Sequence, residues 1–278
     1  MRFSLIMATV GRTREVERLF HTLKQQTHQD LELIVVDQNS DDRLTPLLND
    51  WKNRLKIVHL RASLGVSAAR NFGLAHVSGD VVSFPDDDCW YPPDLLERVS
   101  GILERRPELD GLSGQVEIEQ GPAYARFDKT PGDVTLLNAW RRTVTWTLFL
   151  RSKVTAHIEG FDETLGANSG TAWGGVEDID FALSVVNAGY RIHYDPSITV
   201  FHPNPLEGGY RGMSGRAYYY GAGIGHVWRK HGHPLWFVGY NLLRPLGGTA
   251  LSLMRGDKHK ALYHWGAFRG RLRGWLSR

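Results

Sequence analysis

Three consecutive carboxylates follow the apolar run at residues 80–85, and a histidine follows a later one. Asp86, Asp87 and Asp88 repel one another and are costly to desolvate unless a cation lies among them. Asp86 and Asp88 can both reach one cation in a tight turn, and carboxylate oxygens suit Mg²⁺ or Mn²⁺. His202 could complete such a site, although a lone histidine is more often structural. The triplet therefore predicts either a divalent-cation site that neutralises a diphosphate or an acidic turn in water.

Two further places could contact a nucleotide. Asp37 ends the run "IVVD" and could accept hydrogen bonds from a base imide or a ribose hydroxyl, or it could form only an Asx-turn. Arg70 and Asn71 lie in the expected helix "GVSAARNFGLA". They could contact phosphate or base, and the alternative for Arg70 is an exposed position on an amphipathic helix.

An acidic pair follows a glycine-rich segment at residues 158–175 that contains Trp173. Helical spacing predicts a helix over residues 176–188, with Gly189 just beyond its end and with Glu177 and Asp178 in its first turn. A carboxylate there could take a proton from a sugar hydroxyl. The alternative is that the pair only complements the helix dipole.

Elements that would position these residues alternate along residues 1–204. Apolar runs typical of buried strands are separated by segments with helical spacing, which predicts an α/β domain with a largely parallel sheet. Ligands of such sheets bind beyond the carboxyl ends of the strands, where the acids fall. The first expected helix carries an apolar stripe of Val16, Leu19, Phe20 and Leu23.

Composition supports one large globular body with a basic tail. The chain has 278 residues, 42% of them hydrophobic, and one cysteine, Cys89, which excludes an internal disulfide framework and a cluster of thiolate ligands. The beginning of the sequence does not resemble a signal peptide, so we expect the cytoplasm. Residues 1–204 carry a net charge of −7 and residues 205–278 a net charge of +10. We expect a catalytic domain over 1–204 and a helical extension over 205–278.

The basic tail predicts attachment to an anionic membrane surface. Residues 235–254 approach spanning length, but Arg244 and Pro245 lie at their centre, so we expect two short pieces in the interface. A second segment combines basic residues with an apolar stripe typical of membrane-surface helices, and the alternative is a helix packed on the catalytic body. Its large apolar residues argue against nucleic-acid binding. The stripe comprises Leu262, Trp265, Phe268, Leu272 and Trp275.

Together and in this order, the motifs resemble family 2 glycosyltransferases of the GT-A fold. The resemblance runs over about residues 3–203 through "IVVDQNSDD", "SAARNFGLAHVSGDVVSFPDDD" and "WGGVEDIDFALSVVNAG". It implies a metal-dependent, inverting transfer in which Asp178 is the base, with Glu177 as the alternative because Val176 is inserted before the pair. It implies Trp173 on the acceptor side and a divalent cation, Mn²⁺ or Mg²⁺, at Asp86, Asp88 and His202. The implied donor-binding residues are Thr9, Asp37, Arg70, Asn71, Asp86 and Asp87.

The resemblance also implies partners and a setting. We expect a nucleoside-diphosphate sugar donor, most simply a UDP-sugar, and a glycan or polyprenyl-linked acceptor in surface polysaccharide assembly. The tail places the enzyme at the cytoplasmic face of the inner membrane. Two rivals are a sugar nucleotidyltransferase, which needs a richer glycine loop than "ATVGRTRE" offers, and an inactive glycan- or membrane-binding module, against which the intact acids argue.

Overall fold

A computed structural model describes residues 1–118, 127–204 and 209–277. Residue 205, at which the expected helical extension begins, lies outside the described residues. An eight-stranded sheet has the order β3-β2-β1-β4-β7-β5-β8-β6, and β3, β2, β1 and β4 run parallel. The strands are β1 Phe3–Thr9, β2 Leu31–Asp37, β3 Ile57–Arg61, β4 Val81–Ser83, β5 Gly111–Glu117, β6 Gly132–Asp133, β7 Leu148–Arg151 and β8 Ile192–Phe201. The α/β expectation is confirmed.

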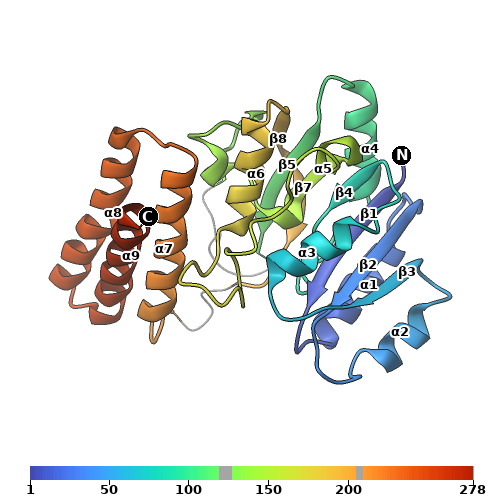
Figure 1. Cartoon of the computed structure of the whole chain (residues 1–278), viewed down its shortest axis with the longest axis horizontal. Helices are drawn as coiled ribbons and strands as arrows, with labels where there is room; N and C mark the ends of the chain where they lie inside the picture. Colours follow the sequence, from blue (N-terminus) through green and yellow to red (C-terminus); the bar gives the residue numbers. More distant parts are fainter. Residues whose placement is uncertain (119–126, 205–208, 278) are drawn as a thin grey trace.

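Helices cover both faces of this sheet and then continue beside it (Figure 1). Alternate residues of β1 point to opposite faces, so Leu5 joins the core under α1, α2 and α4, and Ile6 joins the core under α3 and α6. The expected stripe of the first helix is fully buried. The helices are α1 Arg14–Lys24, α2 Thr45–Trp51, α3 Val66–Leu74, α4 Leu95–Arg105, α5 Ser152–Thr155, α6 Glu177–Asn187, α7 Ser214–Lys230, α8 Leu235–Met254 and α9 Lys258–Leu276, with short 3₁₀ turns at Ala139–Arg141 and Thr145–Thr147.

Helices α7, α8 and α9 form a separate column at the left of Figure 1. Glycines bring α7 and α9 into backbone contact: a Cβ atom on Gly270 would lie 2.1 Å from the carbonyl oxygen of Tyr218, and one on Gly225 would lie 2.0 Å from that of Arg271. Helix α9 therefore packs on α7 through small residues. The expected apolar stripe of α9 lies away from this glycine face, and its Leu262 and Trp265 remain exposed.

The expectation that Pro245 divides residues 235–254 into two pieces is wrong. They form one helix, α8, with the proline inside it. Proline has no N–H to donate to the carbonyl oxygen four residues earlier, which is that of Asn241. Arg271 of α9 supplies the missing donor, because its Nη1 lies 2.6 Å from Asn241 O. None of the helices that the structure describes combines the length and the apolar content that crossing a bilayer requires.

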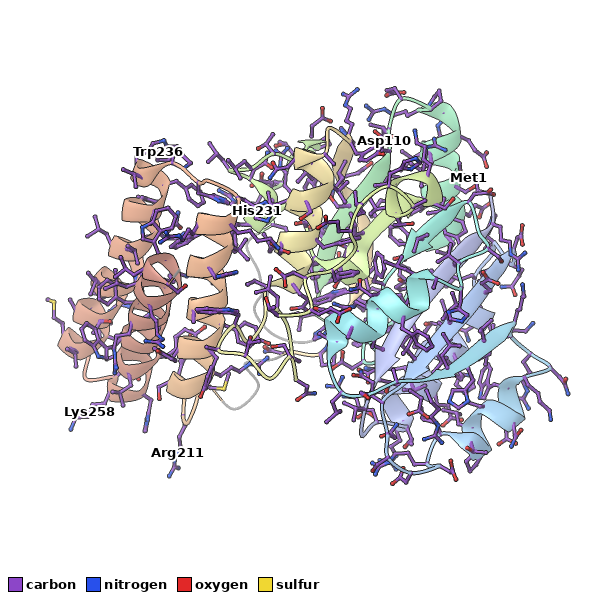
Figure 2. All side chains as sticks on the ribbon, viewed as in Figure 1. Met1, Asp110, Arg211, His231, Trp236 and Lys258 are labelled. Carbon is purple, nitrogen blue, oxygen red and sulfur yellow. The ribbon has the colours of Figure 1, made fainter. Side chains whose placement is uncertain are left out.

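A buried cluster of charged side chains joins this column to the part of the molecule that contains the sheet. Asp180 of α6 is almost fully buried, and it accepts from Lys230 Nζ at 2.8 Å and lies 2.7 Å from His231 Nε2. Lys230 also binds Asp162 at 2.7 Å. Figure 2 shows His231 at the end of α7 that faces the body. Breaking a buried pair leaves an uncompensated charge, so this junction favours one fixed orientation of α7.

The glycine contact predicts opposite effects for two glycine-to-alanine substitutions. Gly270→Ala should lower the free energy of unfolding by about 1–3 kcal/mol, because the new methyl group cannot fit against the backbone of α7. Gly239→Ala, in α8, meets nothing within 4 Å and should raise it by about 0.5–1 kcal/mol. Urea unfolding followed by circular dichroism measures both. Equal effects at the two positions would contradict the close approach.

Candidate active site

A cavity of about 530 Å³ opens beyond the carboxyl ends of β1 and β4. One wall carries the acids 86–88, the opposite wall carries the start of α6, and α7 contributes a third side. Of the predicted site residues, the cavity brings together Thr9, Arg70, Asp86, Asp87, Asp88, Glu177, Asp178 and His202. These predicted residues come from the ends of β1, β4 and β8 and from helices α3 and α6, which meet at the sheet edge that the sequence predicted.

Asp86, Asp88 and His202 form a group that suits a cation. Each offers one ligand atom, and these atoms all lie within 4.8 Å of one another. His202 Nε2 lies 3.1 Å from Asp88 Oδ1. Burial raises the pKa of Asp86 to about 6, and the nearby Asp88 adds to the rise although Arg70 opposes it. Two carboxylates and an imidazole fit Mn²⁺ or Mg²⁺ in donor type, and a cation beside them would oppose the rise in the pKa of Asp86.

Asp87, the middle acid, has its own partners. It accepts from Thr9 Oγ1 at 2.7 Å and pairs with Arg12. Arg12 also reaches Asp88 Oδ2 at 2.8 Å. Burial alone would lower the pKa of Arg12, but the carboxylates of Asp87 and Asp88 outweigh this effect, and the net result is a raised pKa. The triplet therefore divides: Asp87 is held by Thr9 and Arg12, whereas Asp86 and Asp88 face the possible cation site.

Arg70 bridges the two acidic walls. It is almost fully buried, and it binds Asp86 Oδ1 at 2.8 Å and Glu177 Oε1 at 3.1 Å. The exposed-surface alternative for Arg70 is therefore wrong, and the charges of the two acids require the guanidinium between them. Glu177 is committed to this bridge.

Asp178 differs from Glu177 in its surroundings. Its Oδ1 accepts from the backbone N–H of Ile179 at 2.8 Å. Burial raises the pKa of Asp178 to about 7, and the neighbouring Glu177 adds to the rise. The preceding Val176 has φ 65°, a left-handed conformation that a β-branched residue rarely adopts. The pair begins α6 as predicted, and Gly189, with φ 88°, follows its end.

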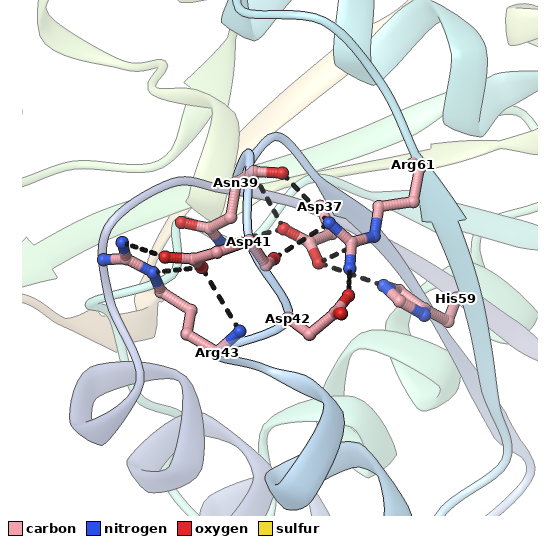
Figure 3. A network of polar contacts seen from close by, with 7 residues as sticks. All are labelled: Asp37, Asn39, Asp41, Asp42, Arg43, His59 and Arg61. Carbon is pink, nitrogen blue, oxygen red and sulfur yellow. Dashed lines mark hydrogen bonds and ion pairs between the residues drawn. The ribbon is translucent and has the colours of Figure 1, made fainter.

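Asp37 lies in a neighbouring polar network rather than among the residues that line the cavity. Its Oδ1 accepts from the backbone N–H of Asn39 at 2.9 Å, which is the Asx-turn alternative, and its Oδ2 lies 3.1 Å from His59 Nε2 and 3.5 Å from Arg61 Nε (Figure 3). The adjacent Gln38 lines the cavity instead. A nucleotide contact by Asp37 remains a prediction.

Asn71 and Trp173 hold loops at the edges of the site. The Asn71 Oδ1 accepts from the backbone N–H of Phe161 at 2.7 Å and its Nδ2 donates to the Phe161 carbonyl at 2.9 Å, which anchors the beginning of the glycine-rich segment 158–175. Trp173 stacks on His226 of α7 with ring centroids 4.8 Å apart. Neither side chain is among the described residues that line the cavity. Their donor and acceptor roles stay predictions.

Sequence reasoning missed several lining residues, among them Arg12, Trp146, Arg216 and Tyr220. Arg12 follows β1 directly, and its position after a strand end could have indicated it. Trp146 stacks on His202 with centroids 4.9 Å apart. Arg216 and Tyr220 come from α7, in the part that the sequence assigned to the tail. No local pattern marks them, because only the tertiary fold brings α7 to the cavity.

The raised pKa of Asp178 makes its predicted role as the base testable through the pH dependence of the rate. A base must be deprotonated, so kcat/KM should fall about tenfold for each pH unit below about 7, and a cation bound nearby should move this limb to lower pH. Rates measured across pH with the donor below saturation check this. A flat profile through this range would contradict the assignment.

Comparisons with known proteins agree with this geometry. The mixed sheet, with its acidic edge facing a second acidic pair, places the chain among glycosyltransferases of the GT-A fold. The sequence profile described as glycosyl transferase family 2 matches residues 4–153, so the chain belongs to this family and is a glycosyltransferase. This also sets aside the nucleotidyltransferase and inactive-module rivals as classes.

Relatives cover parts of the chain to different extents. A glycosyltransferase of Haemophilus influenzae is 24% identical over 72% of this chain and 68% of its own. TuaG of Bacillus subtilis, which is named as a glycosyltransferase of teichuronic acid biosynthesis, is 26% identical. The match covers 51% of this chain and 58% of TuaG. Matches to the first relatives span between 38% and 68% of those proteins.

Solved structures show the same fold. Mannosyltransferase PcManGT from Pyrobaculum calidifontis, solved with GDP-Man and Mn²⁺, has a TM-score of 0.67 at 16% identity and covers 98% of this chain and 87% of its own. S. aureus TarS has a TM-score of 0.63 at 17% identity, covering 96% of this chain and 55% of its own.

Proposed function

We propose that the protein transfers a sugar, with inversion, from a nucleoside-diphosphate sugar to an acceptor hydroxyl in a divalent-cation-dependent reaction. One observation carries the proposal: Asp178, with a pKa near 7, lines the same cavity as the Asp86, Asp88 and His202 group. A base and a site for the leaving diphosphate are what a single displacement at an anomeric carbon needs.

Asp178 acts as the base in this scheme. It takes the proton from the acceptor hydroxyl as the oxygen attacks the anomeric carbon, the bond to the diphosphate breaks, and the leaving group carries away the electron pair. Glu177 is the weaker candidate, because Arg70 holds it at 3.1 Å. One displacement inverts the configuration at the anomeric carbon.

Asp86, Asp88 and His202 would hold the divalent cation, which would supply positive charge to the departing diphosphate. Arg12 lies against Asp87 and Asp88 and places a permanent cation beside the same leaving group. Thr9 fixes Asp87, so the acidic turn keeps its shape. We infer that Arg70 and Gln38 complete the donor side.

The donor and acceptor are proposed from the relatives. Structures of TarS with UDP-GlcNAc and of PcManGT with GDP-Man support a nucleotide-sugar donor, and we propose a UDP-sugar. The similarity to TuaG, which is named for teichuronic acid biosynthesis, supports a glycan or polyprenyl-linked acceptor in surface polysaccharide assembly. Trp173 and the α7 side of the cavity would receive it.

A donor screen tests the function. Nucleotide sugars are offered singly with Mn²⁺ or Mg²⁺, and both the melting temperature and the release of nucleoside diphosphate are measured. One donor should raise the melting temperature, as binding to the folded state requires, and should release its nucleotide slowly to water. Chelation should remove both effects. If no nucleotide sugar stabilises the protein with or without metal, the proposal fails.

We also propose peripheral attachment to the cytoplasmic face of an anionic membrane through residues 205–278, with 1–204 as the catalytic domain. The net charge of +10 and the exposed apolar residues of α8 and α9 support it. Near an anionic surface each lysine or arginine contributes about 1 kcal/mol, so attachment should weaken with salt.

A further inference from the structure

A second cavity, of about 620 Å³, lies between the C-terminal column and residues 137–141 of the body. Helix α7 runs past both cavities: Tyr220 lines the active site and Trp228 lines the second one, about 12 Å further along the helix axis. None of the residues that line the second cavity lines the active site. Its walls are rich in aromatic rings, namely those of Trp140, Trp228, Trp236, Phe237 and Tyr240.

The polar part of this cavity is cationic. Arg141, Arg244 and Arg271 line it, and no lining residue is a carboxylate. Arg141 is paired with Asp128 at 2.8 Å. Within the described part of the chain, Arg244 and Arg271 have no carboxylate within ion-pair distance. Burial, and after it the nearby Arg244, lower the pKa of Arg271 to about 10, as expected of two cations that lack an anion between them.

Two buried donors in these walls have no acceptor. Arg271 uses Nη1 to cap Asn241 O above Pro245, but its Nε is buried without a partner. The indole Nε1 of Trp228 is also buried without a partner. Buried donors are normally hydrogen-bonded, and a donor without an acceptor destabilises the folded state. These two atoms are enclosed by protein, so a phosphate in the cavity would act on its walls by neutralising the arginines.

An apolar surface adjoins the cavity. Trp236 and Tyr240 line it and are also 65% and 60% exposed, and on the same helix Leu235 and Leu243 are 77% and 66% exposed. Figure 2 shows Trp236 at the end of α8 that follows α7. Exposed large apolar residues beside a cationic, aromatic cavity match the two parts of a phospholipid, its charged headgroup and its acyl chains.

We propose that this cavity binds the phosphate of an anionic phospholipid, with the acyl chains lying along the exposed face of α8. This proposal rests on the membrane attachment proposed above and gives it a defined lipid site. A sugar ring is the poorer occupant, because the cavity has aromatic faces but lacks the carboxylates that bind sugar hydroxyls.

The test uses a lipid in solution, so that attraction to a charged surface plays no part. Dihexanoyl phosphatidic acid, kept below its micelle-forming concentration, is titrated into the full chain in a calorimeter. Wild-type protein should bind it saturably at one site, and dihexanoyl phosphatidylcholine should bind at least about tenfold more weakly because its choline opposes the arginines.

Matched variants locate the site. Arg244→Gln should weaken binding about tenfold or more, the size of a lost charge-assisted contact, and its exposed position makes misfolding no concern. Arg255→Gln removes the same charge from the end of α8 outside the cavity and should change binding less than about twofold. Arg271→Lys, which keeps the charge but lacks the fork of donors, should also weaken binding.

Three results of the titrations in solution would overturn the proposal. The first is an absence of saturable binding of the monomeric lipid, and the second is an equal loss in Arg244→Gln and Arg255→Gln. The third is inorganic phosphate binding as tightly as the lipid, which would indicate a free-anion site.

A vesicle experiment separates this site from membrane attachment in general. Sedimentation with phosphatidylcholine vesicles, with and without phosphatidylglycerol, measures attachment. Binding to the anionic vesicles together with monomer binding supports the proposal. Vesicle binding without monomer binding overturns the site and leaves attachment standing, whereas failure with the vesicles removes the membrane source of the lipid and overturns the proposal.

Discussion

Asp178→Asn should abolish most sugar transfer while donor binding persists. An asparagine keeps the size of the side chain and cannot accept the hydroxyl proton, so the loss should be on the order of 10²–10⁴-fold, as for other general bases. Among the described residues, the carboxylate of Asp178 is hydrogen-bonded by the backbone N–H of Ile179, at 2.8 Å from Oδ1, and it forms no ion pair with the donor-side arginines. Transfer rates with a saturating donor, and donor affinity by calorimetry, measure the two effects separately.

Glu177→Gln is the matched control for this result. It removes the same charge one residue earlier, and it should weaken the bridge from Arg70 rather than the proton transfer. We expect a smaller loss of rate that falls partly on donor affinity. If Glu177→Gln gives the larger loss of kcat with donor affinity retained, the base is Glu177 and the assignment of Asp178 is wrong.

Asp86→Ala combined with Asp88→Ala should remove metal-dependent binding of the nucleoside diphosphate. The double variant deletes two of the three ligands in the group, and the remaining His202 cannot hold a divalent cation against water. Affinity for the diphosphate, measured with Mn²⁺ and again with chelator, should differ in the wild type and be equal in the variant. Transfer should fall by at least about 10³-fold, the scale of a lost electrostatic stabiliser of the leaving group.

Glu104→Ala with Glu108→Ala provides the charge-matched control, because both side chains are about half exposed and neither lines the cavity. That control should retain metal-dependent binding. Unchanged diphosphate affinity in the Asp86 and Asp88 variant, with and without chelator, would show that Arg12 and Arg70 bind the donor without a metal.

Sequence predicted the parts of the fold that depend on local patterns. Val16, Leu19, Phe20 and Leu23 recur at helical spacing and are buried as one face of α1. Glu177 and Asp178 begin α6 as expected, because glycines before the helix and after its end mark its limits. Continuous apolar runs indicated strands buried on both faces, and the acids at their ends indicated the edge that carries the site.

Parts that depend on distant residues could not be predicted in this way. Pro245 alone predicts a broken helix, and only Arg271, 26 positions later, satisfies the carbonyl that the proline leaves free. The spacing of Leu262 and Trp265 left open whether this face of α9 meets a membrane or packs on the body. The packed face is instead the row of α9 glycines that lies against the backbone of α7, and no local pattern identified it. Arg216 and Tyr220 carry no pattern that points to the active site.

The contact of α7 with the glycine-rich segment 158–175 limits how such a chain can evolve. A Cβ atom on Gly223 would lie 2.8 Å from the carbonyl oxygen of Gly175, one residue before the inserted valine, and Arg216 and Tyr220 line the cavity. A chimera that joins residues 1–204 to the helices of another relative would therefore carry a foreign wall in its active site. Exchange of the C-terminal helices between related proteins would be tolerated only where the new α7 already fitted the active site. Residues 1–204 and the C-terminal helices are therefore expected to be inherited as one unit.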